Sequence, residues 1–229
     1  VDANDGTVRR TADRELTYGS VFAENKFTFG KFSVTPAVRV EIIDQDLTTT
    51  NFAAPLGTFE KENSVVQPLF GLGLNYDFDN DTSLYANVSQ SYRGTVFSES
   101  LIPSPGATVQ EDIDPALSWS YEIGWRGTPK SRLSFDTSLF CVDLDNRFGV
   151  IANTLQSVGR SINYGVDAAI QADLIGAWDE AHGTSLGKTF GALSLYANVS
   201  LLEAKLHGGP NDGGTPQYSP DYMLRTGLI

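Results

Sequence analysis

Residues that could act as catalysts or metal ligands are few and scattered in this sequence. The two histidines, His182 and His207, lie far apart in the chain, and Cys141 is the only cysteine. This set gives neither a disulfide nor a cysteine-based zinc site, and it offers no acid, base and nucleophile that would converge. We therefore expect no enzymatic activity, no metal site and no cofactor.

Four aspartates come close to a pattern that binds calcium. Asp112 and Asp114 form one pair, and Asp143 and Asp145 form another, with the alternate spacing that calcium ligands use. No Asp-x-Asp-x-Asp-Gly frame surrounds either pair. Solvated loop charge is therefore the favoured interpretation.

Composition excludes two broad classes. The 229 residues include 16 Lys and Arg against 28 Asp and Glu, a net charge of −12, which argues against binding nucleic acid through a basic face. With 41% hydrophobic and 11% aromatic residues the chain is too apolar for a disordered acidic segment. It contains no apolar run long enough for a transmembrane helix, and its first residues lack signal-peptide features. These counts alone suggest a soluble acidic protein.

Hydrophobic residues repeat with a period of two. In the segment 31–44, for example, Val38, Val40 and Ile42 alternate with Arg39 and Glu41, as expected for a strand with one apolar face. Only Leu174–Ala181 favours a short helix, so the predicted class is all-β. Nine strands are predicted, at 15–29, 31–44, 70–77, 84–91, 119–126, 133–141, 162–171, 195–200 and 222–229.

The connections between these segments alternate in length. Turns at 29–31, 79–81 and 128–130 are tight, whereas the polar segments 45–62, 94–117 and 207–220 are long. Short turns at one end and long loops at the other are typical of an up-and-down outer-membrane barrel. Two connections break the rule, since 174–192 is long and the loop near 151–156 is brief.

The two faces of the strands differ in charge. The central apolar faces carry none, and aromatic residues lie near strand ends, as at a lipid interface. A soluble sheet has the same alternation, so this pattern supports a membrane wall without proving it. Pairs such as Glu24 with Arg39 or Glu41, and Glu122 with Arg126, are interpreted as electrostatics of the lumen wall. The charged residues on the polar faces are Glu24, Arg39, Glu41, Glu122, Arg126, Asp136 and Asp167.

One heptapeptide occurs twice. Ser-Leu-Tyr-Ala-Asn-Val-Ser fills residues 83–89 and again 194–200. The separation is too long for a solenoid repeat. We interpret the copies as wall strands in equivalent positions of a barrel, and the alternative is a duplicated binding element.

Six segments, in order, resemble wall strands of TonB-dependent outer-membrane receptors, and the resemblance covers essentially the whole chain. The insertion at 174–192, followed by a Leu-Tyr-Ala-Asn strand, is most similar to receptors of the ferric-citrate type. The six segments are GSVFAEN (19–25), VTPAVRVE (34–41), SLYANVSQSYR (83–93), SWSYEIG (118–124), VGR with YGVD (158–160 and 164–167) and YSPDYML (218–224).

The resemblance implies a barrel of about 22 strands, an N-terminal plug, a TonB box and a terminal aromatic residue. The sequence departs from this pattern because it has no plug-like segment or TonB box and ends at Leu228 and Ile229 within a strand. We therefore predict that 1–229 is a single partial barrel domain and an internal fragment. It would correspond to strands 10 to 18 if its last strand runs toward the periplasm.

The resemblance also implies a function. A receptor of this kind imports a ferric chelate, such as a siderophore or ferric citrate, across a Gram-negative outer membrane. Its partners are the membrane lipid and, through the absent plug, the TonB-ExbB-ExbD complex. Such a chelate is often anionic and is bound by arginines and donors in the upper lumen. Arg93, which ends a polar run, is the first candidate ligand residue, and Arg147, Gln156 and Arg160 are the second.

Other interpretations remain open. Each of the four candidates has the alternative of an ordinary rim position without ligand contact. The whole chain has the alternative of a passive porin or structural barrel, and a third option is a soluble β-sandwich carbohydrate-binding module.

Overall fold

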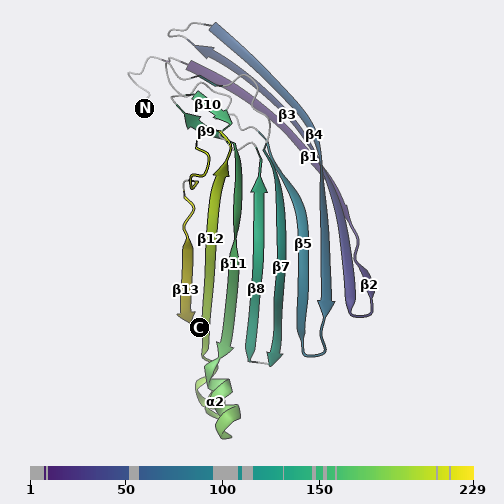
Figure 1. Cartoon of the computed structure of the whole chain (residues 1–229), viewed down its shortest axis with the longest axis vertical. Helices are drawn as coiled ribbons and strands as arrows, with labels where there is room; N and C mark the ends of the chain where they lie inside the picture. Colours follow the sequence, from purple (N-terminus) through teal and green to yellow (C-terminus); the bar gives the residue numbers. More distant parts are fainter. Residues whose placement is uncertain are drawn as a thin grey trace.

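Most of the described chain folds into one large antiparallel sheet, as its period-two pattern predicts. The structure is a computed structural model and describes residues 8, 10–51, 57–94, 108–109, 116–130, 132–145, 148–151, 154–157, 159–209, 211–216 and 218–229. Nine strands of the described residues lie side by side in sequence order, with β2 (Phe27–Phe29) added to β3 (Figure 1). They are β1 (Arg10–Glu24), β3 (Phe32–Asn51), β4 (Gly57–Asp77), β5 (Thr82–Arg93), β7 (Ala116–Lys130), β8 (Leu133–Leu144), β11 (Arg160–Asp173), β12 (Ser194–His207) and β13 (Tyr222–Leu228).

This topology confirms the nine predicted strands and the up-and-down order. The strands form one curved sheet whose edges are β1 and β13, which excludes the β-sandwich alternative (Figure 1). Strand β13 runs toward the end that carries the helix α2, which is the short-turn end and thus the predicted periplasmic end.

The periplasmic turns are fixed by local chemistry. Gly30 has φ +62°, a left-handed conformation that glycine adopts without strain. An ion pair of 2.5 Å joins Lys31 in this turn to Asp79 in the next one. Both side chains are well exposed, so this pair contributes little to stability.

The long periplasmic connection holds two short helices. Helix α2 (Leu174–His182) confirms the predicted helix, and the Asp173 side chain caps it by accepting a 3.0 Å hydrogen bond from the Gly176 N–H. Helix α3 (Leu186–Phe190) was not predicted. Because α3 has only five residues, it is not stable on its own, and its first N–H groups need hydrogen-bond acceptors from a neighbouring element. Asp179 of α2 accepts hydrogen bonds of 2.8 Å from the N–H groups of Leu186 and Gly187.

The segment 45–62 corrects one prediction. Instead of forming a long loop, most of it extends β3 and β4, which stay in register up to Asn51 and Gly57. Its outward side chains are polar because this part of the hairpin lies beyond the apolar band. The alternation of apolar residues that reveals a strand is therefore missing there.

Two loops at the opposite end meet in a second, small sheet. Strands β9 (Phe148–Ile151) and β10 (Thr154–Ser157) form a hairpin, and β10 pairs in parallel with β6 (Thr108–Val109). The connection that follows β5 is thus joined to the connection that follows β8.

Candidate functional site

The inner face of the sheet is polar and hollowed. A hollow of about 820 Å³ is lined by inward residues of β3, β4, β5 and β7, including Thr35, Asn75, Asn87 and Arg126. A second, of about 450 Å³, lies further along the wall between Tyr85 and Arg225. The polar face is therefore the concave one, as in a water-filled lumen.

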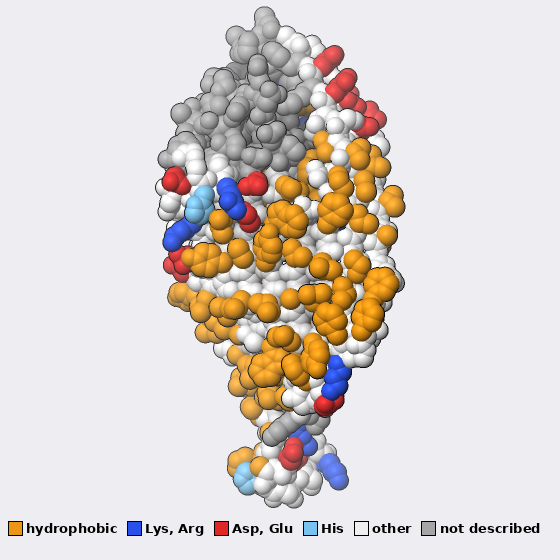
Figure 2. Space-filling model, turned by 45° about the vertical axis from the view of Figure 1, so that its right-hand side comes forward, with side chains coloured by type: hydrophobic (Ala, Val, Ile, Leu, Met, Phe, Trp, Pro, Cys, Tyr) orange, Lys and Arg blue, Asp and Glu red, His pale blue; other side chains and the backbone are white. Residues whose placement is uncertain are grey.

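The outer face is apolar and exposed over the middle of the wall (Figure 2). On β3 and β4, Ile42 is 48% and Val66 is 67% exposed, although they are cross-strand partners and could have been buried in a soluble sheet. One row further out the same face carries Asp44, and the row after that pairs Asp46 with Glu62. This change marks the outer boundary of the lipid layer, because carboxylates are excluded from a lipid face.

Arginines line the extracellular half of the inner face. Arg10 and Arg14 of β1 pair with Asn51 and Leu47 of β3, which share the inward parity of Arg39. Arg93 ends the inward series Asn87, Ser89 and Ser91 of β5. A row of guanidinium groups toward the outside of a lumen suits an anionic ligand. The inward arginines of this half, among the described residues, are Arg10, Arg14, Arg39 and Arg93.

Arg39 is held between two partners. Its Nη2 donates a hydrogen bond of 2.7 Å to the Tyr18 hydroxyl, and its Nε lies 2.6 Å from Oε1 of Glu41. The expected pairing with Glu24 is replaced by this contact along the strand, since residues two apart on a strand share a face.

A second polar group lies in the middle of the wall. The Tyr85 hydroxyl is 3.1 Å from Oε1 of Glu122 and 3.0 Å from Oδ1 of Asp136, and it donates its hydrogen to one of them at a time. The Arg126 guanidinium lies over the Tyr85 ring, 4.9 Å from its centroid, so it stacks on the tyrosine instead of forming the expected pair with Glu122.

The repeated heptapeptide places the same contact twice on the inner face. Tyr85 lies opposite Gly124 of β7, and Tyr196 of the second copy lies opposite Gly227 of β13. A Cβ at Gly124 would lie 2.4 Å from Cζ of Tyr85, and one at Gly227 would lie 2.7 Å from the Tyr196 hydroxyl oxygen. Each ring therefore covers a glycine of the next strand, which supports the interpretation as equivalent wall positions.

Sequence reasoning located only part of this arrangement. Arg93 does point to the inner face, at the outer end of β5. Gln156 lies in β10, where its backbone pairs with Gly149, and Arg147 lies outside the described residues. Arg10 and Arg14 were missed because they precede the predicted strand at 15–29. The signal that finds them is the parity of β1 against β3.

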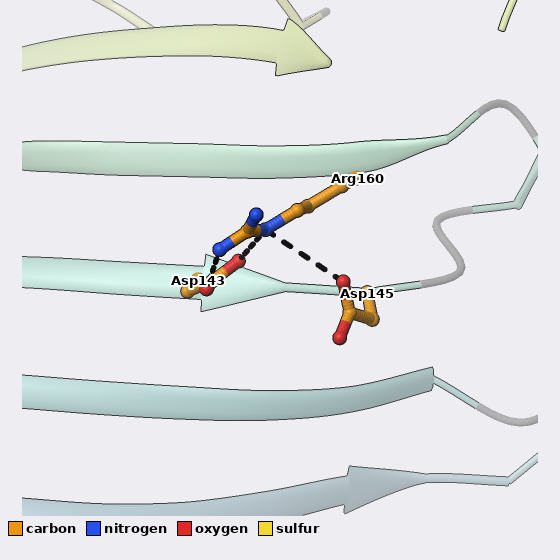
Figure 3. A network of polar contacts seen from close by, with 3 residues as sticks. All are labelled: Asp143, Asp145 and Arg160. Atoms are coloured by element: carbon orange, nitrogen blue, oxygen red, sulfur yellow. Dashed lines mark hydrogen bonds and ion pairs between the residues drawn. The ribbon is translucent and has the colours of Figure 1, made fainter. Parts of the chain in front are cut away.

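Arg160 points the other way. It shares the parity of Ile162, an outward residue, and forms a bidentate ion pair with Asp143, with Nε 2.5 Å from Oδ1, while Asp145 lies 3.7 Å away (Figure 3). This position does not support ligand contact in the lumen. It also gives Asp143 and Asp145 a cation, in line with their interpretation as surface charge.

The histidines and possible metal ligands lie apart from one another in the part of the chain that the structure describes. His182 stacks on Trp178 in α2, whereas His207 lies beside Arg160 at the opposite end of the wall. Among the described residues no group of three or more His, Cys, Asp or Glu side chains is placed to hold a metal ion. The helices of the described chain are too short and too polar to cross a membrane.

Known structures share this fold. The unliganded ferric citrate transporter FecA is 19% identical and superimposes with a TM-score of 0.75, covering 99% of this chain and 32% of that one. For the siderophore receptor PiuA from Acinetobacter baumannii the identity is 14% and the TM-score 0.72, with 93% and 31% covered. The ferric-catecholate import receptor Fiu from E. coli K12 is 14% identical with a TM-score of 0.67, with 93% and 32% covered. The chain thus spans about a third of the length of these structures.

Sequence comparison gives the same result by another route. No curated protein matches the chain. A family model, described as the TonB dependent receptor-like β-barrel, matches residues 1–228. The chain therefore belongs to the TonB-dependent receptor β-barrel family.

Proposed function

We propose that this wall is part of a receptor that imports a ferric chelate with energy supplied through TonB. The observation that supports it best is the row of inward arginines, Arg10, Arg14, Arg39 and Arg93, at the extracellular half of a lipid-facing wall. Guanidinium groups bind carboxylates and other anionic oxygens in a bidentate manner, and most iron chelates carry such oxygens. Arg93 is the predicted ligand residue that this arrangement favours, with Arg147 and Gln156 on the joined loops as further candidates.

The family itself defines the setting. Its members are outer-membrane proteins of Gram-negative bacteria and are transporters, not enzymes, as expected from the sequence. The partners proposed for the whole protein are the chelate, the outer-membrane lipid and the TonB-ExbB-ExbD complex. The outer membrane has no nucleotide supply, so import against a gradient requires energy from elsewhere.

Growth on single iron sources tests this function. A strain lacking the gene is grown with one ferric chelate at a time as its sole iron source, and then complemented with wild type, Arg93→Gln or Arg160→Gln. We expect one chelate to require the gene, Arg93→Gln to weaken its use, and the outward Arg160→Gln to behave as wild type. The uptake should also stop in a strain without TonB.

Two outcomes would overturn the proposal. If uptake persists without TonB, the passive-porin alternative is correct. If no chelate requires the gene, the cargo is of another class, such as cobalamin, nickel, carbohydrate or oligopeptide.

A further inference from the structure

The helix pair α2 and α3 carries exposed apolar side chains at the short-turn end of the wall (Figure 1). Trp178 is 53% and Phe190 is 73% exposed, and Leu174 and Leu186 are each 40% exposed. Residues four apart share one face of a helix, so Leu174 lies beside Trp178 on α2, and Leu186 lies beside Phe190 on α3. Large apolar side chains that gather on two short helices mark a surface that contacts something other than water.

The opposite side of the helix pair is polar. It is hollowed by a space of about 650 Å³, lined in part by Asp173, Gly176 and Lys188. Residues two apart on a helix lie on opposite sides, because each residue turns the helix by about 100°. Trp178 therefore faces away from Gly176 and the hollow, and Phe190 faces away from Lys188. Both helices are thus divided into an apolar and a polar side.

The apolar side of α2 continues the lipid face of the wall. Ala172 of β11 and Leu195 of β12 are cross-strand partners with the outward parity of Ile170. Leu174 and Leu193 come next along these two strands, and the Leu174 N–H donates a hydrogen bond of 2.8 Å to the Leu193 carbonyl. The surface that meets lipid on β11 and β12 therefore passes directly onto the first turn of α2.

The charges of the helix pair also suit a membrane surface. Its two carboxylates have partners, since Asp179 accepts hydrogen bonds from α3 and Glu180 lies 3.5 Å from Arg132. Lys188 makes no ion pair with the described residues and is exposed. A cation that is not neutralised, on the polar side of an apolar helix face, is typical of helices that lie in a membrane interface and attract anionic headgroups.

We infer that α2 and α3 lie along the periplasmic leaflet of the outer membrane, with their apolar side chains at the boundary between phospholipid headgroups and acyl chains. Trp178 suits this depth because its ring is apolar while its N–H can donate to a headgroup. The long periplasmic connection then holds the wall to lipid and does not project into the periplasm. This contact is independent of the cargo that the receptor imports.

Contact quenching by brominated lipid tests this placement. The full-length receptor is reconstituted into phosphatidylcholine vesicles, with or without bromine on the upper part of the acyl chains. The difference in emission between wild type and Trp178→Phe isolates Trp178. The same difference for Trp125→Phe gives a reference, since Trp125 is 46% exposed on the lipid face. We expect bromine to remove a similar fraction of the emission of both tryptophans, and aqueous iodide to quench neither strongly.

Helix α3 provides a matched pair of variants. Phe190→Trp and Lys188→Trp each add one tryptophan at an exposed position, on opposite sides of the helix. The emission that each variant adds to that of wild type reports its own side. We expect bromine to quench the added tryptophan of Phe190→Trp, and iodide to quench that of Lys188→Trp. Heat-modifiable migration in electrophoresis checks that each variant folds.

Three results would overturn the inference. If iodide quenches Trp178 and brominated lipid does not, the helix pair projects into water. If neither quenches it, protein and not lipid contacts this side of α2. If bromine quenches Phe190→Trp and Lys188→Trp equally, the two sides of α3 are assigned wrongly. The proposed import of a ferric chelate stands in each case, because none of these measurements depends on the cargo.

Discussion

Replacing Gly124 with alanine should destabilise the wall, because Tyr85 occupies the space of the new methyl group. The added Cβ would lie 2.4 Å from Cζ, 2.5 Å from the hydroxyl oxygen and 2.7 Å from Cε1 of Tyr85, where ordinary contacts begin at 3.4 Å. The ring must therefore move by about 1 Å or rotate away from the strand.

The cost follows from the contacts that such a movement breaks. Overpacking of this kind typically costs about 1–3 kcal/mol. The hydroxyl also leaves Glu122 and Asp136, which lie 3.1 and 3.0 Å away. A hydrogen bond to a charged group contributes about 1.5–3 kcal/mol when buried, and less here because the ring faces the lumen. We expect Gly124→Ala to lower the free energy of unfolding by about 2 kcal/mol.

Urea unfolding of the full receptor in phospholipid vesicles measures this free energy. Gly71→Ala, on the same inner face between two paired strands, is the matched control, since a Cβ at Gly71 meets only ordinary contacts, with Cβ of Ala37 3.6 Å away. The double variant Tyr85→Ala with Gly124→Ala removes the clash, so its free energy should differ from the sum of the single changes. The reasoning is refuted if Gly124→Ala lies within about 0.5 kcal/mol of Gly71→Ala.

Three further predictions follow from the same geometry. Gly227→Ala should repeat the loss measured for Gly124→Ala, with the same unfolding assay as the check. Ile42→Lys, on the lipid face, should cost about 1–3 kcal/mol in vesicles, whereas Asp44→Lys, one row outside the apolar band, should cost little. The Thr184 hydroxyl and the N–H groups of α3 donate hydrogen bonds to Asp179 and lower its pKa. The stabilisation of the helix pair by this carboxylate is therefore complete above the ordinary carboxyl pKa, and it is lost as pH falls through the lowered value. Hydrogen exchange of 174–193, corrected for intrinsic rates, should be constant from neutral pH down to about 4 and rise below it, and Asp179→Asn should exchange quickly throughout.

The sequence was sufficient for the strands wherever one face meets lipid. Val38, Val40 and Ile42 alternate with polar residues because only every second side chain of a strand points away from the lumen. This pattern predicts both the strand and its inner face. The same physics explains the failure at 45–62. Both faces of that segment lie beyond the apolar band, so outward residues such as Asp46 and Glu62 resemble those of a loop, although the backbone pairing of β3 with β4 continues.

The candidate site was harder to predict because it depends on register between strands. Arg93 could be placed from the parity of its own strand, but Arg10 and Arg14 face inward only by their pairing with β3. Arg160 shows the opposite error. It borders the right loop, yet the outward Ile162 two residues later shares its parity, and this local signal would have placed the guanidinium outside the lumen.

The repeated heptapeptide makes the same packing contact in both copies, but it has different charged neighbours on the inner face. In both copies the tyrosine covers a glycine of the next strand, so this contact sets the local packing. Two residues later the asparagine of each copy meets a different partner, since Asn87 faces Glu122 and Asn198 faces Arg225. If the copies were a duplicated binding element, their cross-strand partners should carry the same charge. The two copies instead have cross-strand partners of opposite charge. We infer that the heptapeptide serves packing within the wall, whereas the charged residues beside it on the inner face differ.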